Sequence, residues 1–193
     1  SNCGEFFQGS NSVAIGSECA QGFQGSNCVA IGFECGNTGQ FSQSVAMGSQ
    51  CGKNDQGFNS VAIGSLSGEI SQGAGSVAMG ANCARFSQGN QSVAIGIDCC
   101  ATGIQGSESI AIGSSCCRDL PQGEQCIAIG TRCCEQVEQG KGSVAIGTEC
   151  SIGSAQGTGS VAIGYQCAYN GQGDGSVAIG VLSGGADQSG QLS

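Results

Sequence analysis

The stretch Ser12-Val13-Ala14-Ile15-Gly16 decides the fold, because the chain returns to this pentad ten times with small variations. The returns end at Gly32, Gly48, Gly64, Gly80, Gly96, Gly113, Gly130, Gly147, Gly164 and Gly180. Their spacing is 16 residues up to Gly96, 17 residues from there to Gly164, and 16 residues at the end. A period this short is too small for a helix pair and matches one coil of a parallel β-solenoid. The sequence therefore predicts an all-β solenoid of about 11–12 coils of 16–17 residues.

Two further columns of residues repeat with the pentad. A glutamine precedes each pentad, at Gln8, Gln24, Gln40, Gln56, Gln72, Gln88, Gln105, Gln122, Gln139, Gln156, Gln172 and Gln188. A cysteine follows most pentads, at Cys3, Cys19, Cys35, Cys51, Cys83, Cys99, Cys116, Cys133, Cys150 and Cys167, and serine replaces it at Ser67 and Ser183. The extra residue of the longer coils falls between the cysteine and the next glutamine, where a turn absorbs it. We therefore expect one solenoid domain over residues 1–187 and a short stub over 188–193.

The composition excludes several classes of protein. Among 193 residues there are 37 glycines, one proline, and neither histidine nor tryptophan, which argues against an ordinary packed core. A net charge of −9 with five basic residues disfavours a nucleic-acid partner, and the lack of a long apolar run disfavours membrane insertion. We find no nucleophile–base pair and no phosphate-binding loop, so we expect no enzymatic activity, no cofactor and no metal site. The chain starts at Ser1 without methionine, and we expect it to be processed or partial.

Strand alternation predicts which side chains face the interior. Within the pentad, Val13 and Ile15 share one face while Ser12 and Ala14 share the other. If the strand continues beyond Gly16, Cys19 falls on the face of Val13 and Ile15. We therefore predict that the Val, Ile and Cys columns point inward. The Gly9 and Gly16 columns are expected at corners, where glycine permits positive φ or close approach of coils.

The glutamine column is predicted to form a ladder. Apolar burial in so short a coil stabilises by roughly 1.5–3 kcal/mol for each large side chain, against about 1–2 kcal/mol of backbone entropy for every residue. Additional interactions along the axis are therefore required. Identical amides stacked at ~4.8 Å can hydrogen-bond to one another.

The fifteen cysteines predict disulfides in an oxidising, extracellular or cell-surface location. Zinc is the alternative, but the thiols recur once per coil rather than as the CxxC pairs typical of zinc sites. Stacked residues one coil apart lie within the Cα separation of a disulfide, about 4.4–6.8 Å. The unbroken runs of four and six cysteines therefore predict the pairs Cys3–Cys19, Cys35–Cys51, Cys83–Cys99, Cys116–Cys133 and Cys150–Cys167.

Five cysteines lie outside this column. Cys100, Cys117 and Cys134 each follow a column cysteine, and alternation places them outward. Cys28 and Cys126 replace the pentad serine and lie six coils apart, too far to pair with each other. At most two of the outward trio can pair along their column, so the remaining thiols are expected to stay free, to bond within a coil or to bond another chain.

Pentads such as Ser60-Val61-Ala62-Ile63-Gly64 and Ser176-Val177-Ala178-Ile179-Gly180, read with Ser67 and Ser183, give the pattern SVAIGxxS. This pattern resembles the head repeat of YadA-like trimeric autotransporter adhesins, over nearly the whole chain. The resemblance implies a left-handed parallel β-roll, surface display, a homotrimer and adhesion. The chain differs from that family in its longer coils and in its cysteines, and it contains no coiled-coil stalk or membrane anchor.

Two functions remain open from the sequence. The first is a structural subunit of an extracellular filament or surface appendage, which polymerises head to tail through solenoid ends that lack capping segments. The alternative is an adhesin head that binds a host or surface receptor, with the longer loops of residues 101–155 as the candidate patch. Ice binding would need a regular threonine face, and the repeat has no threonine column.

Overall fold

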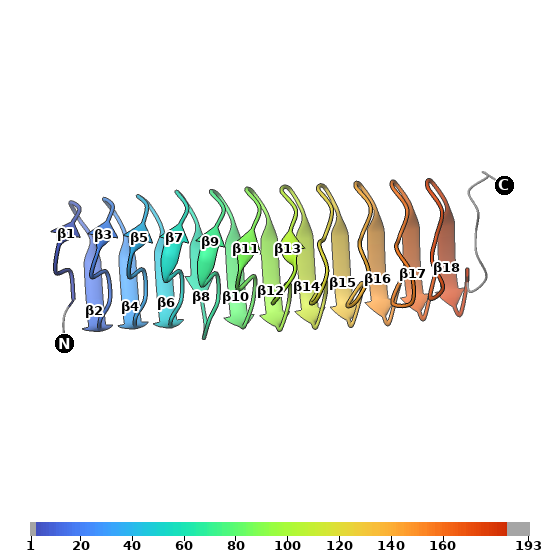
Figure 1. Ribbon diagram of the computed structural model, residues 1–193, viewed down its shortest axis with the longest axis horizontal. Helices are drawn as coiled ribbons and strands as arrows, with labels where there is room; N and C mark the ends of the chain where they lie inside the picture. The colour runs from blue at the N-terminus through green and yellow to red at the C-terminus, as the bar shows by residue number, and fades with distance from the viewer. Residues whose placement is uncertain (1–2, 185–193) are drawn as a thin grey trace.

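The computed structural model describes residues 3–184, and every named element in that range is a β-strand. The strands stack into an elongated solenoid with the chain termini at opposite ends (Figure 1). No helix in the described range is long and apolar enough to cross a membrane. The predicted all-β parallel solenoid of about eleven coils is therefore confirmed.

The pentads form one parallel sheet of eleven strands. Its members are β2 (Val13–Ser17), β4 (Val29–Phe33), β6 (Val45–Ser49), β8 (Val61–Ile63), β10 (Val77–Ala81), β12 (Val93–Ile97), β14 (Ile110–Ser114), β15 (Ile127–Thr131), β16 (Val144–Thr148), β17 (Val161–Tyr165) and β18 (Val177–Val181). Equivalent residues pair from coil to coil, for example Ala14 with Ala30. Every pentad column therefore stacks on itself, as the repeat predicts.

The glutamines form a second, smaller parallel sheet of seven strands. These are β1 (Phe7–Gln8), β3 (Phe23–Gln24), β5 (Gly39–Gln40), β7 (Asn54–Gln56), β9 (Ile70–Gln72), β11 (Ser87–Gln88) and β13 (Ile104–Gln105). From Gln105 to Gln172 the pairing continues only as isolated bridges between successive glutamines. The change coincides with the 17-residue coils, because the extra loop residue shortens the extended segment before each glutamine.

The inward and outward faces of the pentad are the reverse of the prediction. Ala30 and the equivalent alanines are fully buried, and so is Ser44, whereas Val29 and Ile31 are half-buried on the outer surface. Simple alternation fails because Gly32 has φ +136° and Glu34 has φ +51°. These two left-handed residues turn the backbone after the strand. Cys35 therefore lies inside with Ala30, and only the predicted inward position of the cysteine column is correct.

The two glycine columns have the two roles that we predicted. Gly96 has φ +137°, and a Cβ built on it would lie 1.8 Å from the carbonyl oxygen of Gly113 in the next coil. Gly89 shows no positive φ, but a Cβ there would lie 2.5 Å from the backbone nitrogen of Ser107. Close approach of coils therefore requires glycine in both columns, and backbone conformation adds a second requirement at the Gly96 column.

The glutamine side chains join the two sheets across the interior. The amide of Gln139 donates to the carbonyl oxygen of Ile127 at 2.9 Å, and that of Gln56 donates to Val45 at 2.6 Å. Equivalent bonds run from Gln24 to Gln172. In the described residues, only Gln24 donates to a neighbouring glutamine, Gln40, at 3.0 Å. The ladder exists in the backbone, but the predicted amide stacking is wrong for most of the column. Gln188 lies outside the described residues.

We expect Gln139→Ala to lower the free energy of unfolding by about 2–4 kcal/mol, because it leaves a cavity and removes the donor for a buried carbonyl. Gln136→Ala is the matched control, since Gln136 is exposed and lies in the same loop. Urea denaturation followed by circular dichroism measures both. Equal midpoints for the two variants would show that the buried amide does not hold the sheets together.

Candidate functional site

The outer surface of the eleven-stranded sheet is an uninterrupted apolar face. Three residues of each coil point outward, at the positions of Val13, Ile15 and Ser17. The first position holds only Val or Ile in all eleven coils, and the second holds only Ile or Met. The third position varies between Ser, Thr, Ala and a few large residues. No charged residue occupies any of these positions, which together define what we call the apolar face.

The size of the apolar face argues that it contacts another molecule. Eleven strands at ~4.8 Å spacing and about 16 Å width give roughly 850 Å². Monomeric soluble proteins rarely expose contiguous apolar patches larger than about 300–600 Å². The face is also close to the roughly 800 Å² that each partner contributes to a standard protein interface. The sequence prediction missed this site, because it placed these side chains inside.

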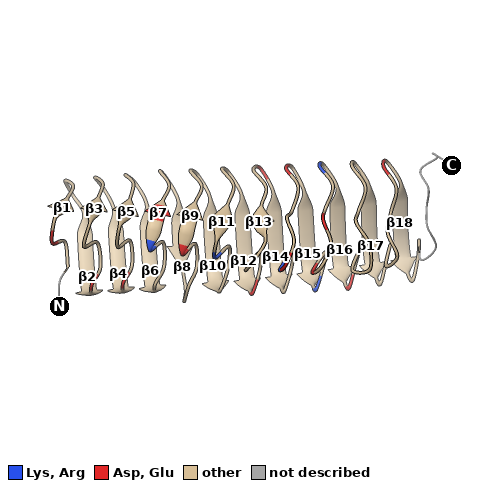
Figure 2. Ribbon diagram, viewed as in Figure 1, with Lys and Arg blue, Asp and Glu red and all other residues tan. Residues whose placement is uncertain are grey.

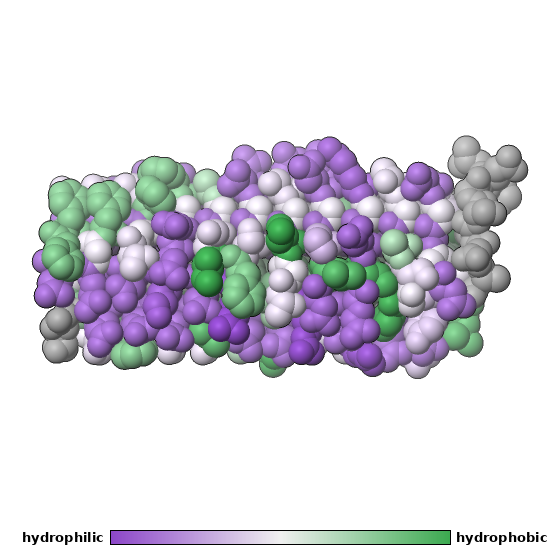
Figure 3. Space-filling view, in the orientation of Figure 1, coloured by the Kyte–Doolittle hydropathy of each residue, from purple (hydrophilic) through white to green (hydrophobic). Residues whose placement is uncertain are grey.

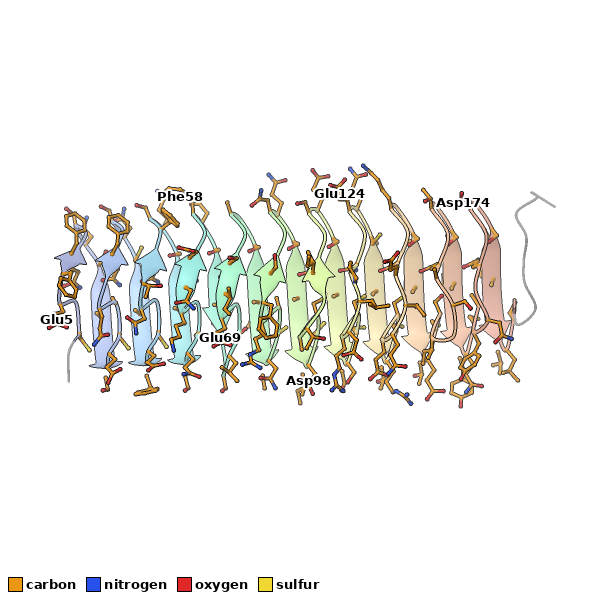
Figure 4. The ribbon with its side chains drawn as sticks, in the orientation of Figure 1. Glu5, Phe58, Glu69, Asp98, Glu124 and Asp174 are labelled. Atoms are coloured by element: carbon orange, nitrogen blue, oxygen red, sulfur yellow. The ribbon has the colours of Figure 1, made fainter. Side chains whose placement is uncertain are left out.

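Charged residues lie on the turns and loops instead (Figure 2). In Figure 4, Glu124 and Asp174 project from turns that precede pentad strands, and Asp98 projects from a turn that follows one. Neighbouring coils pair many of these charges. Lys53 contacts Glu34 at 2.6 Å, and this ion pair lowers the pKa of the Glu34 carboxyl below its usual value. Charge is therefore kept off the apolar face and concentrated on the remaining sides.

The loops of residues 101–155 hold a network of ion pairs. Arg132 contacts Glu135 at 2.7 Å and Glu149 at 2.9 Å, while Arg118 lies 3.7 Å from Glu135. These contacts join three successive coils. They account for charged residues here through intramolecular pairing, so the loops are a weaker candidate for a receptor-binding patch than the sequence indicated.

All fifteen cysteines are free thiols in the structure, and all except Cys3 are buried. Column thiols donate to glycine carbonyl oxygens of the next coil, as from Cys35 to Gly48 at 2.8 Å and from Cys133 to Gly147 at 3.0 Å. Burial is the main cause that raises the pKa of the Cys51 thiol to about 12, and the nearby Cys35 raises it further. A high pKa disfavours the reactive thiolate. These thiols are therefore structural hydrogen-bond donors in this state.

The five cysteines outside the column are also buried, which corrects the predicted outward placement. Cys100, Cys117 and Cys134 have φ between +48° and +52°, and this left-handed conformation directs them into the core. Cys117 donates to the Gln139 amide oxygen at 3.7 Å. Cys28 and Cys126 occupy the buried serine position, and Cys126 donates to Gly140 at 2.9 Å. Bonds from these thiols to another chain would require a coil to open.

We propose that oxidation of the native chain joins the column cysteines in the five pairs given above, because in-register neighbours lie about 4.8 Å apart. Peptide mapping without reduction is expected to recover linked peptides such as Cys116–Cys133. Reduction is then expected to lower thermal stability, since a disulfide typically contributes about 2–4 kcal/mol. Recovery of most column cysteines as free thiols would contradict the pairing and favour the thiol–carbonyl bonds.

A second surface feature is a stack of phenylalanines at the N-terminal end. The rings of Phe7 and Phe23 are parallel with centroids 5.2 Å apart, and Phe41 and Phe58 continue the stack at 6.3 and 4.9 Å. Figure 3 shows an apolar patch over this end of the molecule. The sequence gives only a weak signal for it, because the four rings occupy three different positions in the repeat.

Clusters that could hold a metal ion were also sought. Within residues 3–184, no group of three or more Cys, Asp or Glu side chains has such an arrangement. The cysteine columns run parallel to the axis, so their sulfur atoms follow a line rather than converging on one point.

The comparison with known families agrees with the repeat pattern. Residues 154–166 match the YadA head domain repeat, in two copies. No curated protein and no solved structure matches the chain significantly. The chain therefore carries repeats of the YadA-head type, although the matched segment is a small part of its length.

Proposed function

We propose that the chain is a head module of a cell-surface adhesin, in which three copies pack side by side through their apolar faces. The observation that carries this proposal is the uncharged Val/Ile surface along all eleven strands. Two observations support the remaining parts. The matched repeat is a head-domain repeat, and the sequence resembles heads of trimeric surface proteins.

Lateral packing fits the physical properties of this face. Burying apolar surface contributes about 25 cal/mol per Å², and an obligate interface resembles a domain core cut in half. The ion pairs on the other sides, such as Lys141 with Glu124 at 2.9 Å, leave those sides suited to water. The module would then present its turns outward, away from the shared axis. This arrangement supports an extracellular or cell-surface role in binding rather than in catalysis.

A head-to-tail filament is the second candidate. It is favoured by one observation, namely that β2 and β18 are the outermost strands of the large sheet and each pairs on one side only. An unpaired strand edge can template another chain. The buried positions of Cys28 and Cys126 remove the interchain disulfides that we had expected to support such a filament.

Electron microscopy of the purified chain separates the two candidates. Lateral trimers are expected as short rods, with a length of about 50–55 Å set by eleven coils at ~4.8 Å. Long fibres with an axial repeat near that length would contradict the head-module proposal and favour the filament. Dilution distinguishes the two further, because fibre length depends on concentration while a closed trimer has a fixed size.

A further inference from the structure

The apolar face is nearly the same in every coil, which leaves the axial position of neighbouring copies undefined. Shifting one copy by a single coil again places Val against Val and Ile against Ile. Of the eleven coils, only one loses its partner in such a shift. Repeating strands of this kind specify register weakly. An in-register trimer therefore needs a feature that differs between coils.

The third position of the apolar face provides such a feature. Seven of its eleven members are small, namely Ser17, Ser49, Ser65, Ala81, Ser114, Thr131 and Thr148. Large side chains interrupt them at Phe33 in β4, Ile97 in β12 and Tyr165 in β17. These three are exposed to 44%, 58% and 46%, so they protrude from the same face as the Val and Ile columns. Val181 is a fourth large residue, at the last described strand.

We propose that Phe33, Ile97 and Tyr165 set the axial register between copies of this chain. The inference rests on the proposed lateral association. In a closed ring of identical subunits, equivalent residues lie at the same height on the axis. The three copies of each large side chain then meet at one level and fill the space between the faces together.

A shift by one coil disrupts all three levels at once. Phe33 then opposes Ser17 or Ser49, and Ile97 opposes Ala81 or Ser114. The large side chain meets a small one at each level, which leaves voids and exposes apolar surface. A shift by four coils would bring Phe33 opposite Ile97 again, but it leaves four coils at each end without a partner. The aligned register is therefore the best packed arrangement.

The test is site-specific photo-crosslinking within the full chain. A benzoyl-phenylalanine placed at Ser65 reports which coil of the neighbouring copy lies opposite, through mass spectrometry of the linked peptides. We expect links confined to the coil of residue 65 in the otherwise unmodified chain. The triple variant Phe33→Ser, Ile97→Ser and Tyr165→Thr is expected to spread the links over adjacent coils, with at least a tenfold rise in their fraction.

The matched control removes large exposed side chains away from the apolar face. Phe58→Ser with Phe86→Ser and Tyr169→Ser takes away similar apolar area and is expected to keep a single set of links. The test variant should still fold, because Ser and Thr already occupy the same column in other coils. Circular dichroism checks this for each variant.

Three outcomes are distinguishable. Spread links with an unchanged molar mass support the register role. Links that stay at one coil in the triple variant, again with an unchanged molar mass, overturn it while leaving the lateral association intact. A molar mass of a single chain for the unmodified protein overturns the proposed function, and the register role with it.

Discussion

Gly96→Ala is expected to abolish the native fold or to reduce the free energy of unfolding by at least about 3 kcal/mol. A methyl group there would lie 1.8 Å from the Gly113 carbonyl oxygen, and φ is +137°. Neither partner can move freely, because both belong to the backbone of in-register strands β12 and β14. The effect should spread to neighbouring coils, since each coil is stabilised by its neighbours.

Gly142→Ala is the control for this prediction. Gly142 also has positive φ, +67°, but a Cβ built on it meets nothing within 4 Å. Its replacement should cost only the left-handed conformation of a non-glycine residue, roughly 1–2 kcal/mol. Urea denaturation compares the two variants. Similar losses would mean that close approach of the coils does not define the glycine column.

The second large effect is expected from one charge on the apolar face. Ile112→Glu should convert the trimer into single chains, because it places three carboxylates at one height in an interface that excludes water. The chain itself should stay folded, since Ile112 is only half-buried within its own solenoid. Molar mass from light scattering measures the change, and circular dichroism reports the fold.

Gln136→Glu adds the same charge at an exposed loop position away from the face. It should leave the molar mass unchanged. If Ile112→Glu also leaves the mass of an assembled species unchanged, the apolar face is not the interface. This comparison separates the position of the charge from its effect on overall solubility.

Residue identity at a fixed period predicts register well, and this explains the success of the sequence for the solenoid itself. The return of Gly16 as Gly32, and of Gln8 as Gln24, translates directly into paired strands. The 17-residue coils were correctly placed because insertions collect in turns. These features depend only on which residues repeat, and not on how the backbone turns between them.

The interior could not be predicted by alternation alone. Alternation holds within β4 but not beyond it, because Gly32 and Glu34 adopt positive φ. A non-glycine residue in this conformation, such as Glu34, carries no clear sequence signal. Cys117 was misplaced for the same reason, at φ +48°. The apolar face was therefore missed, and the narrow interior takes Ala, Ser, Cys and Gln instead.

The molar mass of the unmodified chain in solution tests the central claim most directly. One chain has a mass of 18.9 kDa, and the account predicts three times that value, unchanged on dilution through the micromolar range. Light scattering after size-exclusion chromatography gives this mass without assuming a shape, which matters for an elongated molecule. A mass of 18.9 kDa at every concentration would leave the Val/Ile face open to water and contradict the account.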